Sequence, residues 1–325
     1  LGSSSVEFKD LYVDGVAYTD ALGFGTVAMT LPTADGSENQ VLKTDGSGAL
    51  SWTTPSSGGA SEIDDLSDAK SEGDNFTGSL IVGHQTTGTL SGATYNTGVG
   101  LATLDAITTG DYNTAIGFSA LSTNTAGNSN TAGGYNALYA NTSGDYNTAT
   151  GHMALYLNTS GDYNSAFGMT ALKANTTGTR NLAIGYGAYD VADTENDNLA
   201  IGYDALGGAI AGGEYNIAIG NYSLDANTSG DYNTAVGYHG LGANTTGSRN
   251  TASGYMALVS NTTGDYNSAF GMYALASNTT GDYNTASGQQ SLYENTTGTR
   301  NIAIGNNAYD AADTENDNLA IGYDA

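Results

Sequence analysis

Two short acidic runs carry the residues whose types and spacing come closest to a metal site. The runs are Asp190, Asp193, Glu195 and Asp197, and Asp310, Asp313, Glu315 and Asp317. Alternating carboxylates supply the oxygen ligands that Ca²⁺ prefers. Neither run has the glycine that a calcium-binding loop needs for its sharp turn, and an exposed turn also requires polar residues. The pattern therefore favours a solvated turn over a cation site, and we predict no metal and no cofactor.

Candidate catalytic groups are equally sparse. The histidines His84, His152 and His239 occupy different contexts, and none has a nearby serine or cysteine nucleophile with an orienting partner. The glycines form no loop that precedes a helix, as phosphate binding would require. Triplets such as Asn141-Thr142-Ser143 fit an N-glycan acceptor, but their fixed place in a repeat favours a role in a turn. We therefore predict a non-enzymatic chain with no catalytic or cofactor-binding residue.

Composition narrows the choice of partners. The 325 residues include 7 basic and 33 acidic side chains, for a net charge of −26, and no cysteine. Phosphate contacts need clustered Lys or Arg, so no nucleic-acid partner is expected, and anionic membrane surfaces are disfavoured. No apolar run approaches the ~18 residues of a membrane span, so no membrane insertion is expected. Because the sequence starts at Leu1 and stops inside a repeat, we expect it to be part of a longer protein.

A repeat provides the elements that position these residues. The motif Asn-x-Ala-x-Gly recurs every 17 residues, with one spacing of 18 and with Gly98 in the alanine place of the first copy. Its asparagines are Asn96, Asn113, Asn130, Asn147, Asn164, Asn181, Asn198, Asn216, Asn233, Asn250, Asn267, Asn284, Asn301 and Asn318. A constant period this short predicts a solenoid, in which each coil buries its apolar face against its neighbours. The predicted fold is all-β, a parallel β-solenoid whose stacked coils at ~4.8 Å spacing span roughly 60 Å.

Within a coil, alternation places the motif Asn, Ala and Gly on one face of a strand and the second and fourth motif positions on the other. A leucine recurs eight residues after the motif Asn, as in Leu121 and Leu138, and predicts the core column of a second short strand. The following Asn-Thr-Thr-Gly segment predicts a turn whose residues tolerate positive φ. Because such a coil encloses a thin core, we expect the Ala/Gly face to approach another chain, and we predict a homotrimer.

The region before the repeats divides into two parts. Residues 1–60 are expected to form a small N-terminal β module for attachment or shaft building, with two strands in Val6–Tyr18. Residues 61–93 are expected to connect this module to the solenoid and to cap its first coil. A short helix near Ile63–Lys70 and a strand at Ser79–Val82 are predicted there.

The repeat region shows a second level of order. Residues 94–325 are expected to form the solenoid of fourteen 17-residue repeats. The segment DTENDNLAIGYDA occurs at both 193–205 and 313–325. Residues 216–325 therefore align with the start of 96–215, and the two blocks are interpreted as a duplication.

The column of residues immediately before each motif Asn predicts a structural ladder. From the second coil onward its members are Tyr112, Ser129, Tyr146, Tyr163, Arg180, Asp197, Tyr215, Tyr232, Arg249, Tyr266, Tyr283, Arg300 and Asp317. If coils stack in register, each arginine can lie over the tyrosine of the preceding coil. The pairs Arg180–Asp197 and Arg300–Asp317 can then form ion pairs. The alternatives are a tyrosine stripe that stacks on sugar rings and a threonine face that binds ice.

The coil motifs resemble those of two known groups of proteins. NLAIG, NIAIG and NTAIG are similar to the coil signature in the head domains of trimeric autotransporter adhesins. That resemblance implies a left-handed parallel β-roll in a homotrimer that binds host surfaces, although the adhesin coil is shorter. The longer unit NTAIGFSALSTNT, with LPTADGSENQVLKTDGSGALSW, looks more like bacteriophage tail fibres and tail-fibre-domain proteins.

The tail-fibre resemblance implies a structural virion fibre that mediates attachment to the bacterial host surface. The partners it implies are copies of the same chain in a homotrimer, other virion tail or baseplate proteins through the N-terminal region, and a host surface glycan or protein. No receptor-binding residues are identified, and the expected location is the virion. The alternative is a trimeric adhesin on the bacterial cell surface, followed by a secreted structural or ice-binding protein.

Overall fold

The chain divides into two compact units, Leu1–Glu62 and Ile63–Ala325. The computed structural model describes residues 21–24, 27–30, 32, 37, 40–44, 47, 49–53, 69–71, 77–83, 91–191, 193–208, 213–311 and 313–325. The strands expected in Val6–Tyr18 and the side chain of His84 lie outside these residues.

The first unit contains two short antiparallel pairs among its described residues. Strand β1 (Ala21–Phe24) pairs with β2 (Val27–Thr30), and β3 (Val41–Thr44) pairs with β4 (Leu50–Thr53). In the second pair Leu42 lies opposite Trp52. Both pairs join strands that are close in sequence, which is the arrangement expected of hairpins.

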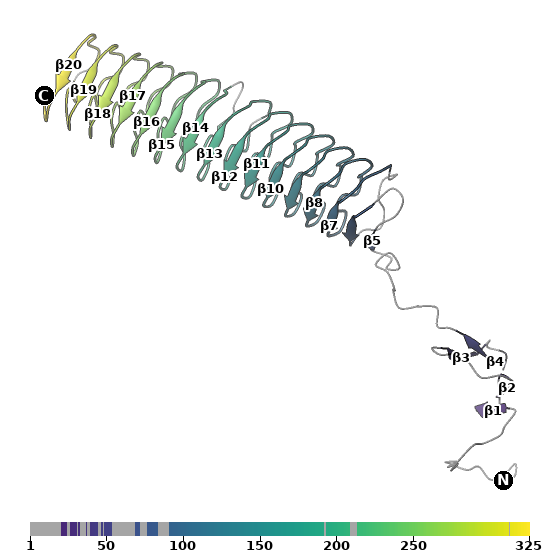
Figure 1. The fold of residues 1–325 in the computed structure, drawn as a ribbon. Helices are drawn as coiled ribbons and strands as arrows, with labels where there is room; N and C mark the ends of the chain where they lie inside the picture. Colours follow the sequence, from purple (N-terminus) through teal and green to yellow (C-terminus); the bar gives the residue numbers. More distant parts are fainter. Residues whose placement is uncertain are drawn as a thin grey trace, which may run out of the picture. The chain divides into compact units, whose positions relative to one another are not determined.

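The second unit contains one sheet, which is 16-stranded among the described residues. It begins with β5 (Ala69–Ser71), which pairs antiparallel with β6 (Leu80–Val82). The strands that follow are β7 (Thr97–Val99), β8 (Thr114–Ile116), β9 (Thr131–Gly133), β10 (Thr148–Thr150), β11 (Ser165–Phe167), β12 (Leu182–Ile184), β13 (Leu199–Ile201), β14 (Ile217–Ile219), β15 (Thr234–Val236), β16 (Thr251–Ser253), β17 (Ser268–Phe270), β18 (Thr285–Ser287), β19 (Ile302–Ile304) and β20 (Leu319–Ile321). From β6 to β20 every neighbouring pair is parallel and consecutive in sequence, which confirms the parallel β-solenoid (Figure 1).

The helix expected near Ile63–Lys70 is wrong at its C-terminal end, because Lys70 lies in β5 and pairs with Ile81. The edge of a parallel stack leaves unpaired backbone groups, and an antiparallel strand satisfies them. The strand expected at Ser79–Val82 is confirmed as β6. No helix among the described residues is long and apolar enough to span a bilayer.

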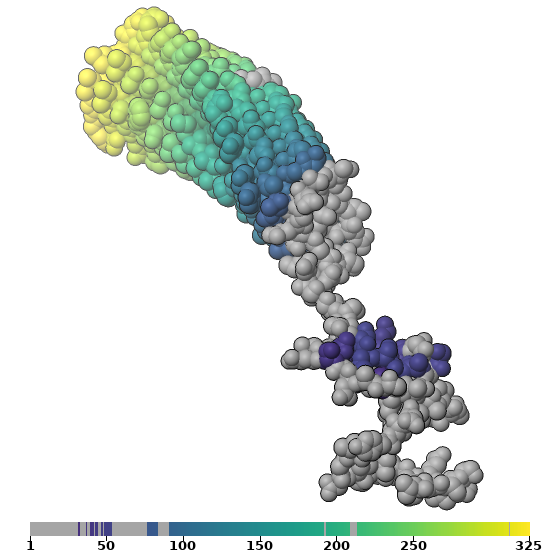
Figure 2. All heavy atoms as spheres, turned by 45° about the vertical axis from the view of Figure 1, so that its right-hand side comes forward, coloured from purple at the N-terminus to yellow at the C-terminus, as the bar shows by residue number. Residues whose placement is uncertain are grey.

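The sequence period sets the register of the sheet. Each motif position pairs with the same position one coil later, as in Ala149 with Ala166. The single longer repeat does not disturb this register, because Leu199 still pairs with Ile217 and the extra residue falls between strands. In Figure 2 the colour changes steadily along this body, so each coil contacts mainly its neighbours in sequence. This is the nearest-neighbour architecture of a solenoid.

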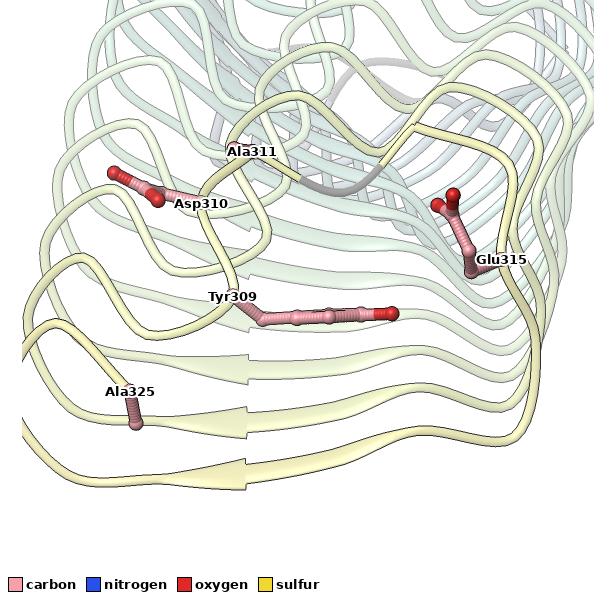
Figure 3. A pocket seen from close by; sticks show the side chains of 5 residues that line it. All are labelled: Tyr309, Asp310, Ala311, Glu315 and Ala325. Carbon is pink, nitrogen blue, oxygen red and sulfur yellow. The ribbon is translucent and has the colours of Figure 1, made fainter.

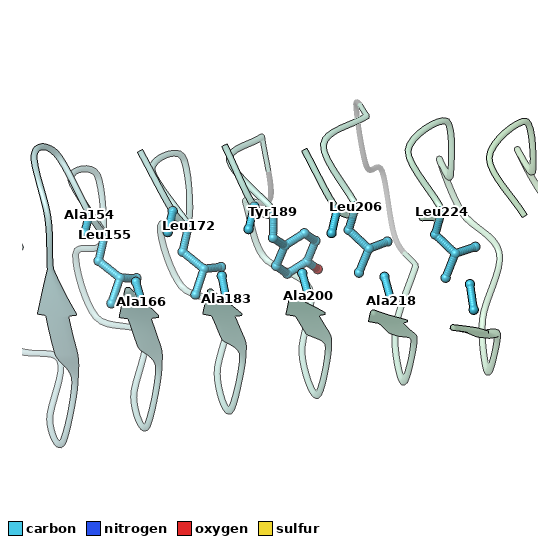
Figure 4. Close-up of a cluster of buried hydrophobic side chains, with 14 of the residues drawn as sticks. Ala154, Leu155, Ala166, Leu172, Ala183, Tyr189, Ala200, Leu206, Ala218 and Leu224 are labelled. Atoms are coloured by element: carbon cyan, nitrogen blue, oxygen red, sulfur yellow. The ribbon is translucent and has the colours of Figure 1, made fainter. Parts of the chain in front are cut away.

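The core lies inside each coil. The motif alanines, such as Ala115 and Ala166, are fully buried, and the recurring leucines, such as Leu155 and Leu172, pack against them (Figure 4). The motif alanine face therefore meets the coil's own leucine column, and the expectation that it approaches another chain is wrong. The second and fourth motif positions point outward, as the alternation predicts.

Backbone conformation differs from the expectation at two places in each coil. The leucine column is buried as predicted but does not lie on a strand, because Leu121 has φ 50° and Ser119 has φ 52°. Neighbouring coils hold this conformation: the Ser119 N–H donates to the Leu101 carbonyl, and the Leu121 N–H donates to the Ala137 carbonyl. The Asn-Thr-Thr-Gly turns hold none of the positive φ angles. Positive φ angles occur instead at the motif Gly, at residues of the leucine segment such as Ser119 and Leu121, and at the residue before each motif Asn.

Two columns of buried asparagines run along the interior. In the motif column, Asn113 Nδ2 donates to the Gly127 carbonyl at 2.9 Å, and its Oδ1 accepts the Asn130 N–H at 3.0 Å. In the turn column, Asn141 Nδ2 donates to Asn124 Oδ1 at 2.9 Å. Each amide therefore forms a hydrogen bond with a buried backbone or side-chain group of a neighbouring coil.

Candidate functional site

The column before the motif Asn forms a ladder of largely exposed side chains along the solenoid. Its tyrosine rings stack at 5.1 Å for Tyr95–Tyr112, 4.9 Å for Tyr146–Tyr163, 4.9 Å for Tyr215–Tyr232 and 4.8 Å for Tyr266–Tyr283, between ring centroids. The Arg249 guanidinium lies between two of these pairs, 5.5 Å from the Tyr232 ring and 5.2 Å from the Tyr266 ring. Stacking of this kind follows directly from in-register coils about 4.8 Å apart.

The other two arginines of the column turn toward the following coil. Arg180 Nε and Nη2 donate to the two carboxylate oxygens of Asp197 at 2.6 and 2.7 Å, and Arg300 contacts Asp317 in the same way at 2.5 and 2.8 Å. The hydrogen bond from Arg180 lowers the pKa of Asp197 below its ordinary value. Among the described residues, a guanidinium over a tyrosine ring occurs only at Arg249, so Tyr163 and Tyr283 do not carry the cation–π contact expected of them.

This geometry bears on sugar binding. A ring that stacks on a pyranose must offer an open face, whereas the paired tyrosines turn faces toward one another, with interplanar angles of 3° for Tyr146–Tyr163 and 4° for Tyr215–Tyr232. One face of each paired ring is therefore occupied by its neighbour, and Arg249 lies over the other faces of Tyr232 and Tyr266. The arrangement fits a packing ladder better than a row of sugar subsites.

A second aromatic column follows the motif Gly and was not predicted. Phe118 stacks on Tyr135 at 5.3 Å, Tyr135 stacks on His152 at 5.1 Å, and Tyr186 stacks on Tyr203 at 5.2 Å. The signal was present in the sequence, because an aromatic residue follows the motif Gly in many repeats. His152 thus lies in a stack of rings.

The outward face of the sheet lies between these two aromatic columns. It presents the second and fourth motif positions, and large apolar side chains there remain exposed, including Ile116 at 54% and Phe270 at 46%. Further exposed members of the fourth position are Val99, Phe167, Ile184, Val236, Ile304 and Ile321. We call this surface, with its two aromatic borders, the outer sheet face. It is broad, repetitive and rich in apolar atoms, so it is better suited to binding another surface than to catalysis.

The acidic runs do not converge on one point. The Glu195 carboxylate accepts the N–H groups of Asp193 and Thr194 at 3.0 and 3.1 Å and so closes its own turn. Asp193 accepts from the Thr176 hydroxyl, and Asp197 pairs with Arg180. The second run repeats these contacts at Asp313, Glu315 and Asp317. No group of three or more His, Cys, Asp or Glu side chains suited to a metal occurs among the described residues.

One tyrosine of the first block replaces a core leucine. Tyr189 occupies the leucine column, is fully buried, and accepts a hydrogen bond from Asn198 Nδ2 at 2.6 Å (Figure 4). Burial raises its pKa well above the ordinary value, with a further contribution from the Glu195 charge. The turn asparagine is replaced by alanine in this coil, and Asn175 Oδ1 of the preceding coil has no partner. The phenol thus supplies a polar group where the turn column of amides is interrupted.

The remaining candidates have structural surroundings. The His239 ring stacks on Tyr222 at 4.9 Å and meets the Tyr238 ring edge-on at 4.5 Å, between ring centroids. Asn141 is fully buried and engaged in the turn column, so its side-chain nitrogen is inaccessible to a glycan in the folded chain. Comparisons with protein-family models, with curated proteins and with solved structures find no match.

Proposed function

We propose that this chain is a rigid, non-enzymatic segment of a virion tail fibre that mediates attachment to a bacterial host surface. The observation that supports a mechanical role is the repetition of every cohesive contact along one axis. The sheet and the motif amide column connect each coil to the next, and the turn amides and the stacked rings add contacts between many of the coils. Such a stack resists bending because every coil is held at several points around its circumference.

The proposal includes self-association as a homotrimer through the outer sheet face. Stacked strands of ~4.8 Å spacing and four side-chain columns give a face of roughly 60 by 20 Å, or about 1,200 Å². The largest apolar patch on a typical monomer is ~300–600 Å², and a standard interface buries ~800 Å² per partner. Threonine and serine interrupt the face, but exposed apolar side chains occur along its whole length. Copies of the chain offer a surface of matching length and repeat to cover it.

Sedimentation equilibrium tests this association with substitutions that the fold already accepts. Ile184, Ile201 and Ile219 occupy a column in which another coil carries Thr150. The triple Ile→Thr variant is therefore expected to keep the solenoid but to weaken the trimer by at least ~10-fold in its dissociation constant, because apolar area is lost from the interface. Thr150→Ser is the matched control. Trimer affinity that is unchanged in the triple variant, or a stable monomer of the parent chain, would contradict the proposal.

Attachment is tested with the intact chain labelled at its N-terminus. Saturable binding to intact bacteria that is lost when their surface polysaccharide or proteins are stripped is the expected result. Failure to bind any strain of a broad panel would contradict the attachment role. Release of reducing sugars from the cells by the purified chain would contradict the non-enzymatic role.

A further inference from the structure

The ladder before the motif Asn contains one small residue. Ser129 stands between Tyr112 and Tyr146, in a column whose other members are Tyr, Arg or Asp. Two coil steps of ~4.8 Å separate the rings on either side of it by roughly 9.6 Å. Tyr112 stacks on Tyr95 and Tyr146 stacks on Tyr163, so the second face of each ring is directed toward the coil of Ser129. We call the space between these two faces, with Ser129 at its base, the ring notch.

The second block contains the same notch with an occupant. There Arg249 takes the place of Ser129, between Tyr232 and Tyr266. The Arg249 guanidinium lies 5.5 Å from the Tyr232 ring and 5.2 Å from the Tyr266 ring, both within the ~6 Å of a cation–π contact. The chain therefore displays, in its own second block, a group that fits between two such rings.

The backbone is the same in the two copies. Ser129 and Arg249 have φ 56° and 58°, and their N–H groups donate to the carbonyls of Asp111 and Asp231 at 2.8 and 2.9 Å. The tyrosine one coil earlier has φ 58° in both copies, and the tyrosine one coil later has φ 57° in both. Because the two copies differ in the side chain between the rings, the faces that Arg249 covers in one are left uncovered by Ser129 in the other.

The exposure of the rings agrees with this difference. Tyr112 and Tyr146 are 59% and 53% exposed, whereas Tyr232 and Tyr266 are 50% and 41% exposed. The open hollow of about 370 Å³ in the last coils offers no such pair, because Tyr309 is the one aromatic side chain among its described lining residues (Figure 3). Two ring faces directed toward one another therefore distinguish the ring notch from that hollow.

Charge favours a cation as the occupant. The chain has a net charge of −26, and the two tyrosines of the ring notch directly follow Asp111 and Asp145. The field of these carboxylates attracts cationic groups. The three arginines of the chain already contact tyrosine or aspartate side chains of their own column. A guanidinium for the notch therefore has to come from a different polypeptide.

We propose that the ring notch is a binding site for the guanidinium of an arginine side chain on a partner polypeptide. The planar cation lies between Tyr112 and Tyr146 as Arg249 lies between its own two tyrosines. Because the ladder borders the outer sheet face, the notch lies at the rim of the proposed trimer interface, where side chains stay accessible to solvent. The assignment does not depend on the role in a virion, since it rests on the two rings and their occupied copy.

Fluorine NMR of the full chain, with fluorotyrosine in place of Tyr146, tests the proposal. The probe is the blocked peptide acetyl-Gly-Arg-Gly-amide, and the control peptide carries citrulline, which has a planar side chain of similar shape without the charge. The arginine peptide is expected to shift the resonance saturably. The citrulline peptide is expected to bind at least ~5-fold more weakly, because two cation–π contacts are lost. Fluorotyrosine in place of Tyr266 should not respond, because Arg249 covers that ring.

Exchange of the two residues gives matched variants that the fold already accepts. Ser129→Arg should abolish the response at Tyr146, and Arg249→Ser should create a response at Tyr266. Absence of any shift, an unchanged response in Ser129→Arg, or equal binding of the two peptides would overturn the proposal. A response to methyl glycosides and not to the arginine peptide would overturn it in favour of a glycan. A response confined to the triple Ile→Thr variant would overturn it for the assembled chain and leave the trimer proposal standing.

Discussion

Removal of one motif asparagine is expected to destabilise the solenoid far more than removal of an exposed asparagine one coil earlier. Asn233 is fully buried, its Nδ2 donates to the Gly247 carbonyl at 2.8 Å, and its Oδ1 accepts the Asn250 N–H at 3.0 Å. Asn233→Ala leaves the Asn250 N–H without a partner inside the coil, whereas the Gly247 carbonyl keeps the hydrogen bond that Asn244 Nδ2 donates at 2.8 Å. An unsatisfied buried N–H costs about 1–3 kcal/mol and the lost hydrogen bond to the carbonyl about 0.5–1.5 kcal/mol, so the free energy of unfolding should fall by about 1.5–4.5 kcal/mol.

Asn221→Ala is the matched control. Asn221 is exposed, and its Oδ1 accepts one N–H, from Tyr203, at 2.9 Å. Water can replace that acceptor, so the loss should stay within ~0.5 kcal/mol. Because solenoids can unfold in parts, urea denaturation is combined with hydrogen exchange of the Asn250 amide, which should lose protection only in Asn233→Ala. Equal urea midpoints and equal exchange in the two variants would refute the role assigned to the buried amide column.

Two further pairs of substitutions compare near-identical positions. Gly134→Ala should prevent local stacking of the coils, because Gly134 has φ 134° and an added Cβ would lie 2.5 Å from the Gly151 carbonyl oxygen. Gly133→Ala should be tolerated, because the nearest atoms to its added Cβ would be 3.8 Å away. Thermal unfolding of the two variants distinguishes these outcomes. Tyr189→Phe should lower the free energy of unfolding by about 1–2 kcal/mol, because a buried hydrogen bond is lost, whereas Tyr309→Phe should leave it almost unchanged. Equal losses in the two variants would contradict the role assigned to the Tyr189 hydroxyl. Because burial raises the pKa of folded Tyr189, its contribution to stability is present below pH ~10 and lost as pH rises above it, so Tyr189→Phe should flatten the alkaline fall in the urea midpoint.

Much of the fold follows from the period alone. A fixed spacing puts equivalent residues in register, so the motif positions, the burial of the alanines and leucines, and the pairing of Arg180 with Asp197 could all be argued from the sequence. These features depend on sequence separation and strand alternation, which a repeat makes explicit. The same argument holds for an insertion, because the spacing of 18 before Asn216 only lengthens a connection.

Features that depend on backbone conformation and on the direction of side chains could not be predicted from the repeat spacing. The leucine column looks like a strand in sequence, but Leu121 has a left-handed conformation that the neighbouring coils stabilise. The alanine face could pack inside the coil or against another chain, and only the path of the leucine column shows that it packs inside. For the arginines, a tyrosine on one side competes with an aspartate on the other, and the bidentate ion pair prevails at Arg180.

Electron–electron distance measurement between two spin labels tests the stacked rod most directly. The chain has no cysteine, so cysteines placed at Met169 and Asn306 carry the only labels, and dilution with unlabelled chain removes distances between copies. Both positions are exposed and follow the motif Gly, after β11 and β19. Eight coil steps of ~4.8 Å predict a single narrow distance of about 38 Å. A broad distribution, or a distance below about 25 Å, would contradict a solenoid built by stacking one coil per 17 residues.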